Sequence, residues 1–167
     1  MPVEPFRIDD IPVGDLARIG LCRLPGRSGD LAADLDEIAR WAPAIVVSMT
    51  ETDEMNEKGA AGLLSTLARA GIAHAHFPIR DFGTPEPVDL RWPALAERLH
   101  AVLDANGRVL LHCLGGKGRS GMVALRLLIE RGCAPGEALK MVRDARPGAV
   151  ETEAQALWGK SGRRREA

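Results

Sequence analysis

Residues 112–121 read His112-Cys113-Leu114-Gly115-Gly116-Lys117-Gly118-Arg119-Ser120-Gly121, so five residues, three of them glycine, separate a cysteine from an arginine. An apolar run precedes this stretch and follows the turn signal Asn106-Gly107, which predicts a buried strand over residues 108–112. From Ser120 onward the sequence is apolar on most sides, as in a central helix. The cysteine therefore lies at the end of a strand, in a loop that opens into a helix.

A glycine-rich loop in this position can bind an anion. The glycines allow the backbone to curl and to turn its N–H groups inward, at the positive end of the following helix. The same field favours a thiolate over a thiol at the cysteine. The arginine adds a planar fork that grips two phosphate oxygens at once. We predict that the residues which bind a phosphate or another oxyanion are Leu114, Gly115, Gly116, Lys117, Gly118 and Arg119.

The loop also has to be distinguished from a structural cysteine and from a nucleotide-binding loop. A cysteine after a strand is commonly a buried structural residue, and a cysteine and an arginine at this spacing also occur by chance. A Walker A loop requires Gly-x4-Gly-Lys followed by Ser or Thr. Gly116-Lys117 is followed by glycine, and Gly159-Lys160-Ser161 lacks the upstream glycine because position 154 is alanine. The surrounding glycines, histidine and serine favour a nucleophilic cysteine.

The segment resembles the signature loop of the cysteine-dependent protein tyrosine phosphatase superfamily, of the dual-specificity type. The resemblance implies that Cys113 is the nucleophile and that Arg119 binds the phosphate. It also implies that Ser120 assists the departure of the thiolate and that His112 supports the cysteine.

The same superfamily uses an aspartate on an upstream loop as general acid. Asp81 matches it within Pro78-Ile79-Arg80-Asp81-Phe82-Gly83-Thr84-Pro85, just after a predicted strand. On pattern alone a loop aspartate is more often a turn former or a helix cap. Glu86 and Asp89 are the competing carboxylates, and Asp89 is expected to cap the next helix.

Several short segments narrow the resemblance to the cyclin-dependent-kinase-associated phosphatase and its bacterial-type relatives, over about residues 18–158. Besides the loop they are Leu24-Pro25-Gly26, Pro78-Ile79, Gly83-Thr84-Pro85, residues 142–146 and Gly148-Ala149-Val150. One departure concerns a Gln-Thr-x-x-Gln stretch of that group, where this chain has Glu151 in place of the first glutamine and keeps the second as Gln155. Participation of either residue in positioning water is left open, because Thr152 and Gln155 also form a helix capping box.

Three further observations concern polar side chains. Arg143 and Arg146 are expected to pair with aspartate on a helix surface rather than to contact substrate. His74 and His76 share one face of a strand and are expected to be packed or hydrogen-bonded rather than to bind a metal. Cys22 is expected to be a packed strand residue, with a redox partnership with Cys113 as the less favoured alternative.

The chain of 167 residues, 46% of them hydrophobic, is long enough for one sizeable core, so we expect one domain over residues 1–167, with loosely ordered ends. Strands are expected over 18–23, 44–48, 72–79 and 108–112. Helices alternate with them, beginning at Asp30 and then spanning 60–70 and 92–103, followed by helices from Ser120, Pro135 and Thr152. This order predicts an α/β fold with a mostly parallel sheet, helices on both faces and ligands beyond the carboxyl ends of the strands.

Composition disfavours several other classes of protein. A net charge of −1 gives no general attraction to nucleic acid, and no stretch reaches the ~18 apolar residues of a membrane span. The absence of a signal-peptide pattern favours a cytoplasmic protein. Cysteines at positions 22, 113 and 133 provide no disulfide framework and no metal site, so we expect neither metal nor cofactor.

The predicted activity is hydrolysis of phosphate monoesters on phosphotyrosine, and on phosphoserine or phosphothreonine, through a phosphocysteine intermediate. Lys117 also resembles the lysines in the loops of phosphoinositide phosphatases, which implies a phosphoinositide or another small phosphate ester as substrate. Those loops often carry two lysines, and this chain has Leu114 at the first position. A catalytically weak module that binds phosphoproteins is an alternative that the intact Cys113, Arg119 and Asp81 disfavour. A rhodanese-like sulfurtransferase is a further alternative, but it would not need the upstream acid.

Overall fold

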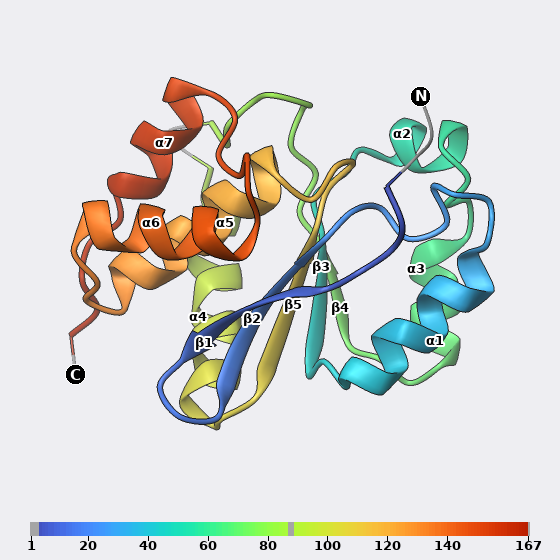
Figure 1. Cartoon of the computed structure of the whole chain (residues 1–167), viewed down its shortest axis with the longest axis horizontal. Helices are drawn as coiled ribbons and strands as arrows, with labels where there is room; N and C mark the ends of the chain where they lie inside the picture. The colour runs from blue at the N-terminus through green and yellow to red at the C-terminus, as the bar shows by residue number, and fades with distance from the viewer. Residues whose placement is uncertain (1–3, 87–88, 167) are drawn as a thin grey trace.

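The computed structural model describes residues 4–86 and 89–166 (Figure 1). Five strands form one sheet in the order β1-β2-β5-β3-β4. Only the pair β1–β2 is antiparallel, and the remaining pairs are parallel. The strands are β1 (Asp9–Val13), β2 (Ala17–Cys22), β3 (Ile45–Ser48), β4 (His74–His76) and β5 (Arg108–His112).

The predicted strand β5 lies at the centre of the sheet, between β2 and β3. Its residues Val109, Leu110 and Leu111 are fully buried, as expected of a parallel strand covered on both faces. In the register, His112 at its carboxyl end lies between Cys22 and Ser48. The carboxyl ends of three strands therefore meet where the glycine-rich loop begins.

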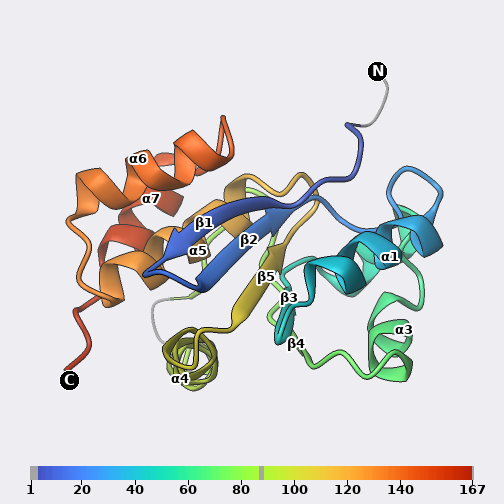
Figure 2. The ribbon, with the colours of Figure 1, turned by 60° about the horizontal axis from the view of Figure 1, so that its bottom comes forward.

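Helices cover both faces of the sheet, so the predicted fold class is confirmed (Figures 1 and 2). Apolar side chains of α1, α2 and α3 pack in one cluster with Val46 and Leu110 of the sheet. Side chains of α4, α5 and α6 pack in the second cluster with Val47 and Leu111. The helices are α1 (Leu31–Trp41), α2 (Thr52–Glu57), α3 (Leu63–Arg69), α4 (Arg91–Asp104), α5 (Gly118–Glu130), α6 (Pro135–Ala145) and α7 (Glu153–Lys160).

Helix α5 is the central helix that the sequence predicts. Every residue of it except Arg126 is buried. Gly159 of α7 allows a close approach, since a Cβ there would lie 2.6 Å from Cδ2 of Leu125. The first turn of α5, which carries the arginine of the loop, is therefore held by packing on several sides.

Three local features differ from the sequence-based prediction. The strand expected over 72–79 is reduced to β4. Ile72 donates its N–H to Leu67 at the end of α3, whereas Phe77 and Ile79 still donate to Ser48 and Met49 beyond the strand. Strand β1 is not predicted, because Asp9, Asp10 and Pro12 are poor strand formers. An edge strand tolerates proline. Helix α2 is not predicted either, because it has only six residues and one buried side chain.

Candidate functional site

The predicted catalytic residues come together beyond the carboxyl end of β5. Cys113 follows that strand directly, and Arg119 and Ser120 lie in the first turn of α5. Asp81, in the connection between β4 and α4, accepts a hydrogen bond from Arg119 over 3.1 Å. One phosphate-sized group can therefore face a sulfur, a guanidinium and a carboxyl.

The backbone carbonyls of the loop point away from its centre. The Leu114 oxygen accepts hydrogen bonds from the Leu24 N–H at 3.1 Å and from Arg27 at 3.2 Å. The Lys117 oxygen accepts from the N–H groups of Gly121 at 2.9 Å and Val150 at 3.1 Å. Both carbonyls are thus bound by the surrounding structure.

The two carbonyls between them are held by one side chain. Arg146 donates from Nη2 to the Gly115 oxygen at 2.8 Å and from Nε to the Gly116 oxygen at 2.9 Å. The expected pairing with aspartate on a helix surface is wrong for both arginines, since the aspartate that Arg146 binds is Asp9 of β1. Arg146 is buried, and Arg143 donates to the carbonyls of residues 149 and 150. Asp144 pairs with Lys140 instead.

The N–H groups of the loop remain available to an anion. No hydrogen bond within residues 4–86 and 89–166 has the N–H of any residue from 114 to 118 as its donor. Gly116 has a φ of 73°, and a Cβ there would lie 2.5 Å from the carbonyl oxygen of Cys22. Only glycine fits this turn, which presents the inward N–H groups as an anion-binding nest.

Arg119 is 1% exposed and is fixed by several acceptors. It forms two hydrogen bonds with the Glu54 carboxylate, at 2.7 and 2.9 Å, and a third with the Ile79 carbonyl at 2.9 Å. Burial would lower the pKa of the guanidinium, but the bond to Glu54 and the nearby Cys113 raise it above its usual value. The loop therefore contains a permanent, oriented positive charge.

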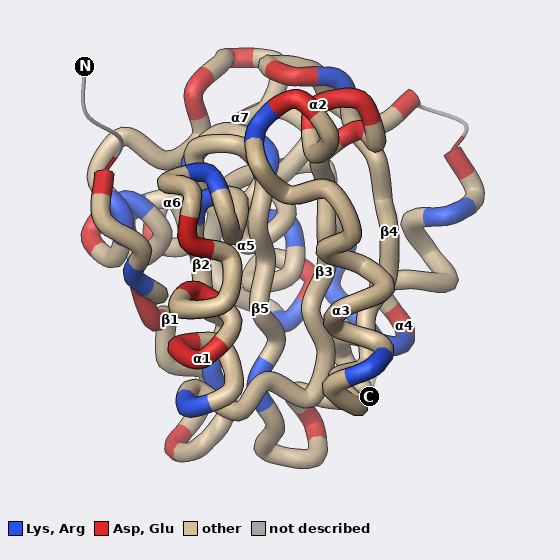
Figure 3. Tube along the Cα trace, turned by 90° about the vertical axis from the view of Figure 1, so that its right-hand side faces the viewer, with Lys and Arg blue, Asp and Glu red and all other residues tan. Residues whose placement is uncertain are grey.

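Glu54 is a residue of this site that sequence analysis does not identify. Burial raises the pKa of its carboxyl, but hydrogen bonds from Arg119 and from the Glu51 backbone outweigh burial, so the pKa is lowered. Its position in the segment after β3 is the available signal, since the carboxyl ends of parallel strands share one edge of the sheet. Figure 3 shows acidic residues along α2 above these strand ends.

His112 is completely buried beneath the loop. Its Nε2 lies 2.6 Å from Oγ of Ser48, and its Nδ1 lies 3.4 Å from the Cys113 carbonyl. Burial lowers its pKa to about 4, so the ring is neutral near pH 7. The neutral ring thus connects β3 with the backbone of Cys113.

Cys113 and Ser120 occupy the floor of the loop. Cys113 is 3% exposed. The buried Ser120 hydroxyl has no hydrogen-bond partner among the described residues. A buried hydroxyl without a partner is costly, which distinguishes Ser120, in the first turn of α5, from an ordinary structural serine.

The segment that carries Asp81 is a tight turn. The Gly83 N–H donates to the Arg80 carbonyl at 2.8 Å, and Asp81 accepts the N–H of Phe82 at 3.0 Å. Phe82 has a φ of 59°, an uncommon conformation for a bulky residue. The Asp81 side chain is 41% exposed, and its contact with the site is the ion pair with Arg119.

Helix α7 contacts both parts of the site. Gln155 forms the predicted capping box with Thr152 and also donates to the Gly83 carbonyl at 3.2 Å. Glu151 lies beside the loop, since a Cβ on Gly118 would be 2.4 Å from its Oε1. Of the competing carboxylates, Asp89 accepts the N–H of Arg91 at the start of α4.

The remaining cysteine of the sheet points away from the site. Cys22 packs in the cluster of α1 and α3, whereas Cys113 packs in the cluster on the other face. Burial raises the pKa of the Cys22 thiol far above its usual value. These observations favour the packed role expected for Cys22.

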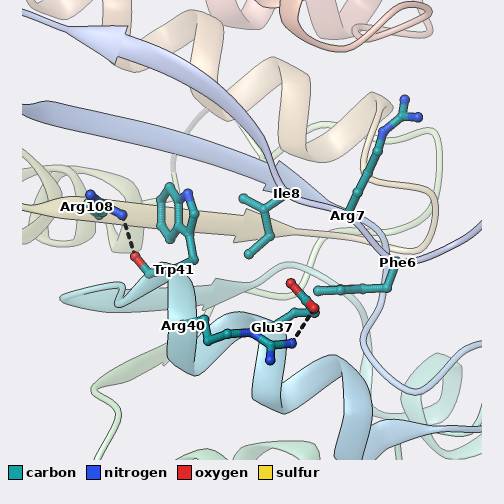
Figure 4. Close-up of a pocket in the computed structure, with 7 residues that line it drawn as sticks. All are labelled: Phe6, Arg7, Ile8, Glu37, Arg40, Trp41 and Arg108. Atoms are coloured by element: carbon teal, nitrogen blue, oxygen red, sulfur yellow. Dashed lines mark hydrogen bonds and ion pairs between the residues drawn. The ribbon is translucent and has the colours of Figure 1, made fainter.

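A surface pocket of about 530 Å³ lies apart from the loop (Figure 4). Phe6, Glu37, Trp41 and Arg108 are among its lining residues, and the Arg108 guanidinium donates to the Trp41 carbonyl at 2.7 Å. None of its lining residues belongs to the loop, so it has no part in the site described above.

Comparisons with known proteins identify the family of the chain. The fold, with a Cys-x5-Arg loop between a central strand and a buried helix, is that of the cysteine-dependent protein tyrosine phosphatases of the dual-specificity type. A family model described as Cyclin-dependent kinase inhibitor 3 (CDKN3) matches residues 10–138. The chain belongs to this family.

Individual relatives support the assignment. The chain is 32% identical over 141 residues to cyclin-dependent kinase inhibitor 3 of Mus musculus, and the match covers 80% of this chain and 66% of the mouse protein. A structure of kinase associated phosphatase with its catalytic-site cysteine replaced by serine has a TM-score of 0.78 at 26% identity and 93% coverage of both chains. Tk-PTP in its active form has a TM-score of 0.70 at 30% identity, covering 90% of this chain and 92% of that one.

Within residues 4–86 and 89–166, no helix combines the length and the apolar character needed to cross a bilayer.

Proposed function

We propose that this protein is a phosphatase that hydrolyses phosphate monoesters on phosphotyrosine, and on phosphoserine or phosphothreonine, through a phosphocysteine intermediate. The observation that carries the proposal is the orientation of the loop. The bonded carbonyls of residues 114–117 face outward, and the N–H groups of residues 114–118 have no acceptor among the described residues. Such a cradle neutralises the oxygens of a phosphate and of its transition state.

In the first step, the Cys113 thiolate attacks phosphorus in line with the leaving oxygen. The bond between phosphorus and that oxygen breaks as the sulfur–phosphorus bond forms, and Asp81 gives its proton to the departing alcohol or phenol. Arg119 and the loop N–H groups hold the other three oxygens. Glu54 and Ile79 fix the plane of the guanidinium, and its bond to Asp81 is exchanged for one to the phosphate.

In the second step, water attacks the phosphocysteine. The ionised Asp81 accepts a proton from this water, the sulfur–phosphorus bond breaks, and inorganic phosphate leaves. The Ser120 hydroxyl donates a hydrogen bond to the departing thiolate, which uses the donor that has no other described partner. The thiolate must stay reduced between turnovers, so a reducing compartment such as the cytoplasm is part of the proposal.

Hydrolysis of an aryl phosphate tests the reaction. We expect turnover that orthovanadate inhibits, no turnover with Cys113→Ser, and a decrease of about 100-fold or more in kcat with Asp81→Asn. Full activity of the cysteine variant would contradict the mechanism. Phosphate binding without wild-type turnover would support a phosphoprotein-binding module, and turnover of thiosulfate without phosphate release would support a sulfurtransferase.

The class of substrate needs its own experiment. The names of the relatives, including kinase associated phosphatase, favour a phosphorylated protein, whereas Lys117 in the loop favours a phosphoinositide or another small phosphate ester. A panel of phosphopeptides and phosphoinositides, read with Cys113→Ser as a substrate trap, separates these classes. Preferential release of phosphate from phosphotyrosine peptides supports the main proposal.

A further inference from the structure

We propose that Arg146 is a positioning residue of the phosphate loop and that Glu4 and Asp9 complete it, so that the N-terminal segment takes part in oxyanion binding. The inference rests on the proposed function, because it gives this arginine a task in holding the phosphate site. Arg146 follows α6 directly and is 2% exposed. Its side chain reaches the backbone carbonyls of the loop.

The two hydrogen bonds of Arg146 fix the orientation of two consecutive peptide groups. In a trans peptide the C=O and the N–H point in opposite directions. The Gly115 and Gly116 carbonyls are bound on the Arg146 side at 2.8 and 2.9 Å. The N–H groups of Gly116 and Lys117 therefore point to the opposite side, into the cradle.

Glycine makes this restraint necessary. Residues 115 and 116 are both glycine, and glycine has more accessible backbone conformations than any other residue. A flexible nest would lose part of its anion affinity in becoming ordered. The other loop carbonyls, those of Leu114 and Lys117, accept from backbone N–H groups, whereas these two carbonyls depend on Arg146.

The charge of Arg146 is balanced by the N-terminal segment. Asp9 Oδ2 lies 2.7 Å from Nη1, and Glu4 Oε2 lies 3.3 Å from Nη2. A buried guanidinium is strongly unfavourable without such partners. Asp9 opens β1, and α6 packs against this strand, so pairing of β1 with β2 places the carboxylate beside Arg146. The charge of Arg146 is therefore balanced by residues that lie more than 100 positions away in the sequence.

Lysine cannot replace this arginine. A lysine keeps the charge and three donors on one nitrogen, but it lacks the planar fork that holds two acceptors in fixed directions. Arg146→Lys consequently separates the positioning role from the charge. Arg146→Met removes both. Asp9→Asn leaves Arg146 in place and weakens its carboxylate partner, which also pairs with Arg7.

The test measures inhibition of aryl phosphate hydrolysis by inorganic phosphate, with kcat, for the full chain and its variants. We expect the inhibition constant to rise about tenfold or more in Arg146→Met, less in Arg146→Lys, and about threefold in Asp9→Asn, with lower kcat. Lys140→Met, an exposed position of α6, is the matched control and should match wild type. Circular dichroism verifies folding, and Arg146→Lys and Asp9→Asn decide the matter should Arg146→Met fail to fold.

Two outcomes overturn the inference, and they differ in what else they reject. Folded Arg146 variants with wild-type kcat and wild-type phosphate inhibition would leave the phosphatase intact and remove the positioning role. A wild-type protein that neither hydrolyses aryl phosphate nor gains protection of Cys113 from iodoacetamide by phosphate would reject both proposals. A rise in the inhibition constant in the order wild type, lysine, methionine supports the role.

Discussion

At the scale of single residues, the proposed site depends on how Arg119 is held. Its guanidinium binds Glu54 through both Nη atoms, and the same Nη2 also donates to Asp81. A bidentate carboxylate fixes the plane of the arginine, and that plane decides whether the fork faces the loop. Glu54 is thus a positioning residue for the group that would bind phosphate.

We expect Glu54→Gln to lower kcat/KM for an aryl phosphate by about tenfold or more, with a higher KM. The amide keeps the shape of the side chain but removes the charge and one acceptor oxygen. Steady-state kinetics measures the effect. Glu57→Gln, on the exposed side of the same helix, is the control, and equal kinetics of the two variants would remove the role of Glu54.

The buried His112 predicts a pH dependence of stability. Its pKa falls from its ordinary value of 6.5 to about 4 in the folded protein because it is buried. The unfolded chain therefore binds the extra proton first, and stability is lost as the pH falls from about 6.5 toward 4. The cost between pH 7 and pH 5 is about 2 kcal/mol.

Urea denaturation at the two pH values measures this cost. Wild type should lose more free energy of unfolding than His112→Gln does, because His74, His76 and His100 are common to both proteins. The same loss in wild type and variant would assign the pH dependence to another group.

At the scale of elements, helix α7 packs closely against α5 because Gly159 has no side chain. A Cβ on Gly159 would lie 2.6 Å from Cδ2 and 2.9 Å from Cγ of Leu125. We expect Gly159→Ala to destabilise the protein by about 1–3 kcal/mol through overpacking, measured by urea denaturation. Gly136→Ala, in α6 with no atom within 4 Å, should instead be neutral or stabilising because alanine favours helix. Similar values for both variants would contradict the packing argument.

The elements that sequence predicts best are those with apolar runs bounded by glycine or proline. Strand β5 and helix α5 have such runs, and the residues of the loop between them identify its chemistry. Strand β1 has two aspartates and a proline, so its pairing with β2 outweighs its weak propensity. The contacts of Glu54 and Arg146 join segments far apart in the chain, which no local pattern specifies.

At the scale of the whole molecule, the glycine-rich loop and the Asp81 turn are supported by different parts of the fold. The loop lies between the central strand β5 and the buried helix α5. The Asp81 turn lies on the connection from the edge strand β4, and its residues Asp81 and Phe82 are exposed. The proposed phosphate-binding half therefore lies in the core, and the proposed acid lies at the periphery.

This arrangement has a consequence for native-state hydrogen exchange. Amides over residues 122–129 of α5 are expected to exchange only through global unfolding, because the helix is enclosed by the sheet side and by α6 and α7. Amides near Asp81 should exchange through small local openings that leave α5 protected. Mass spectrometry of exchanged peptides measures both rates, and equal rates would contradict the difference. A chain that has opened only its acid turn would then still bind phosphate while it has lost the proton donor for turnover.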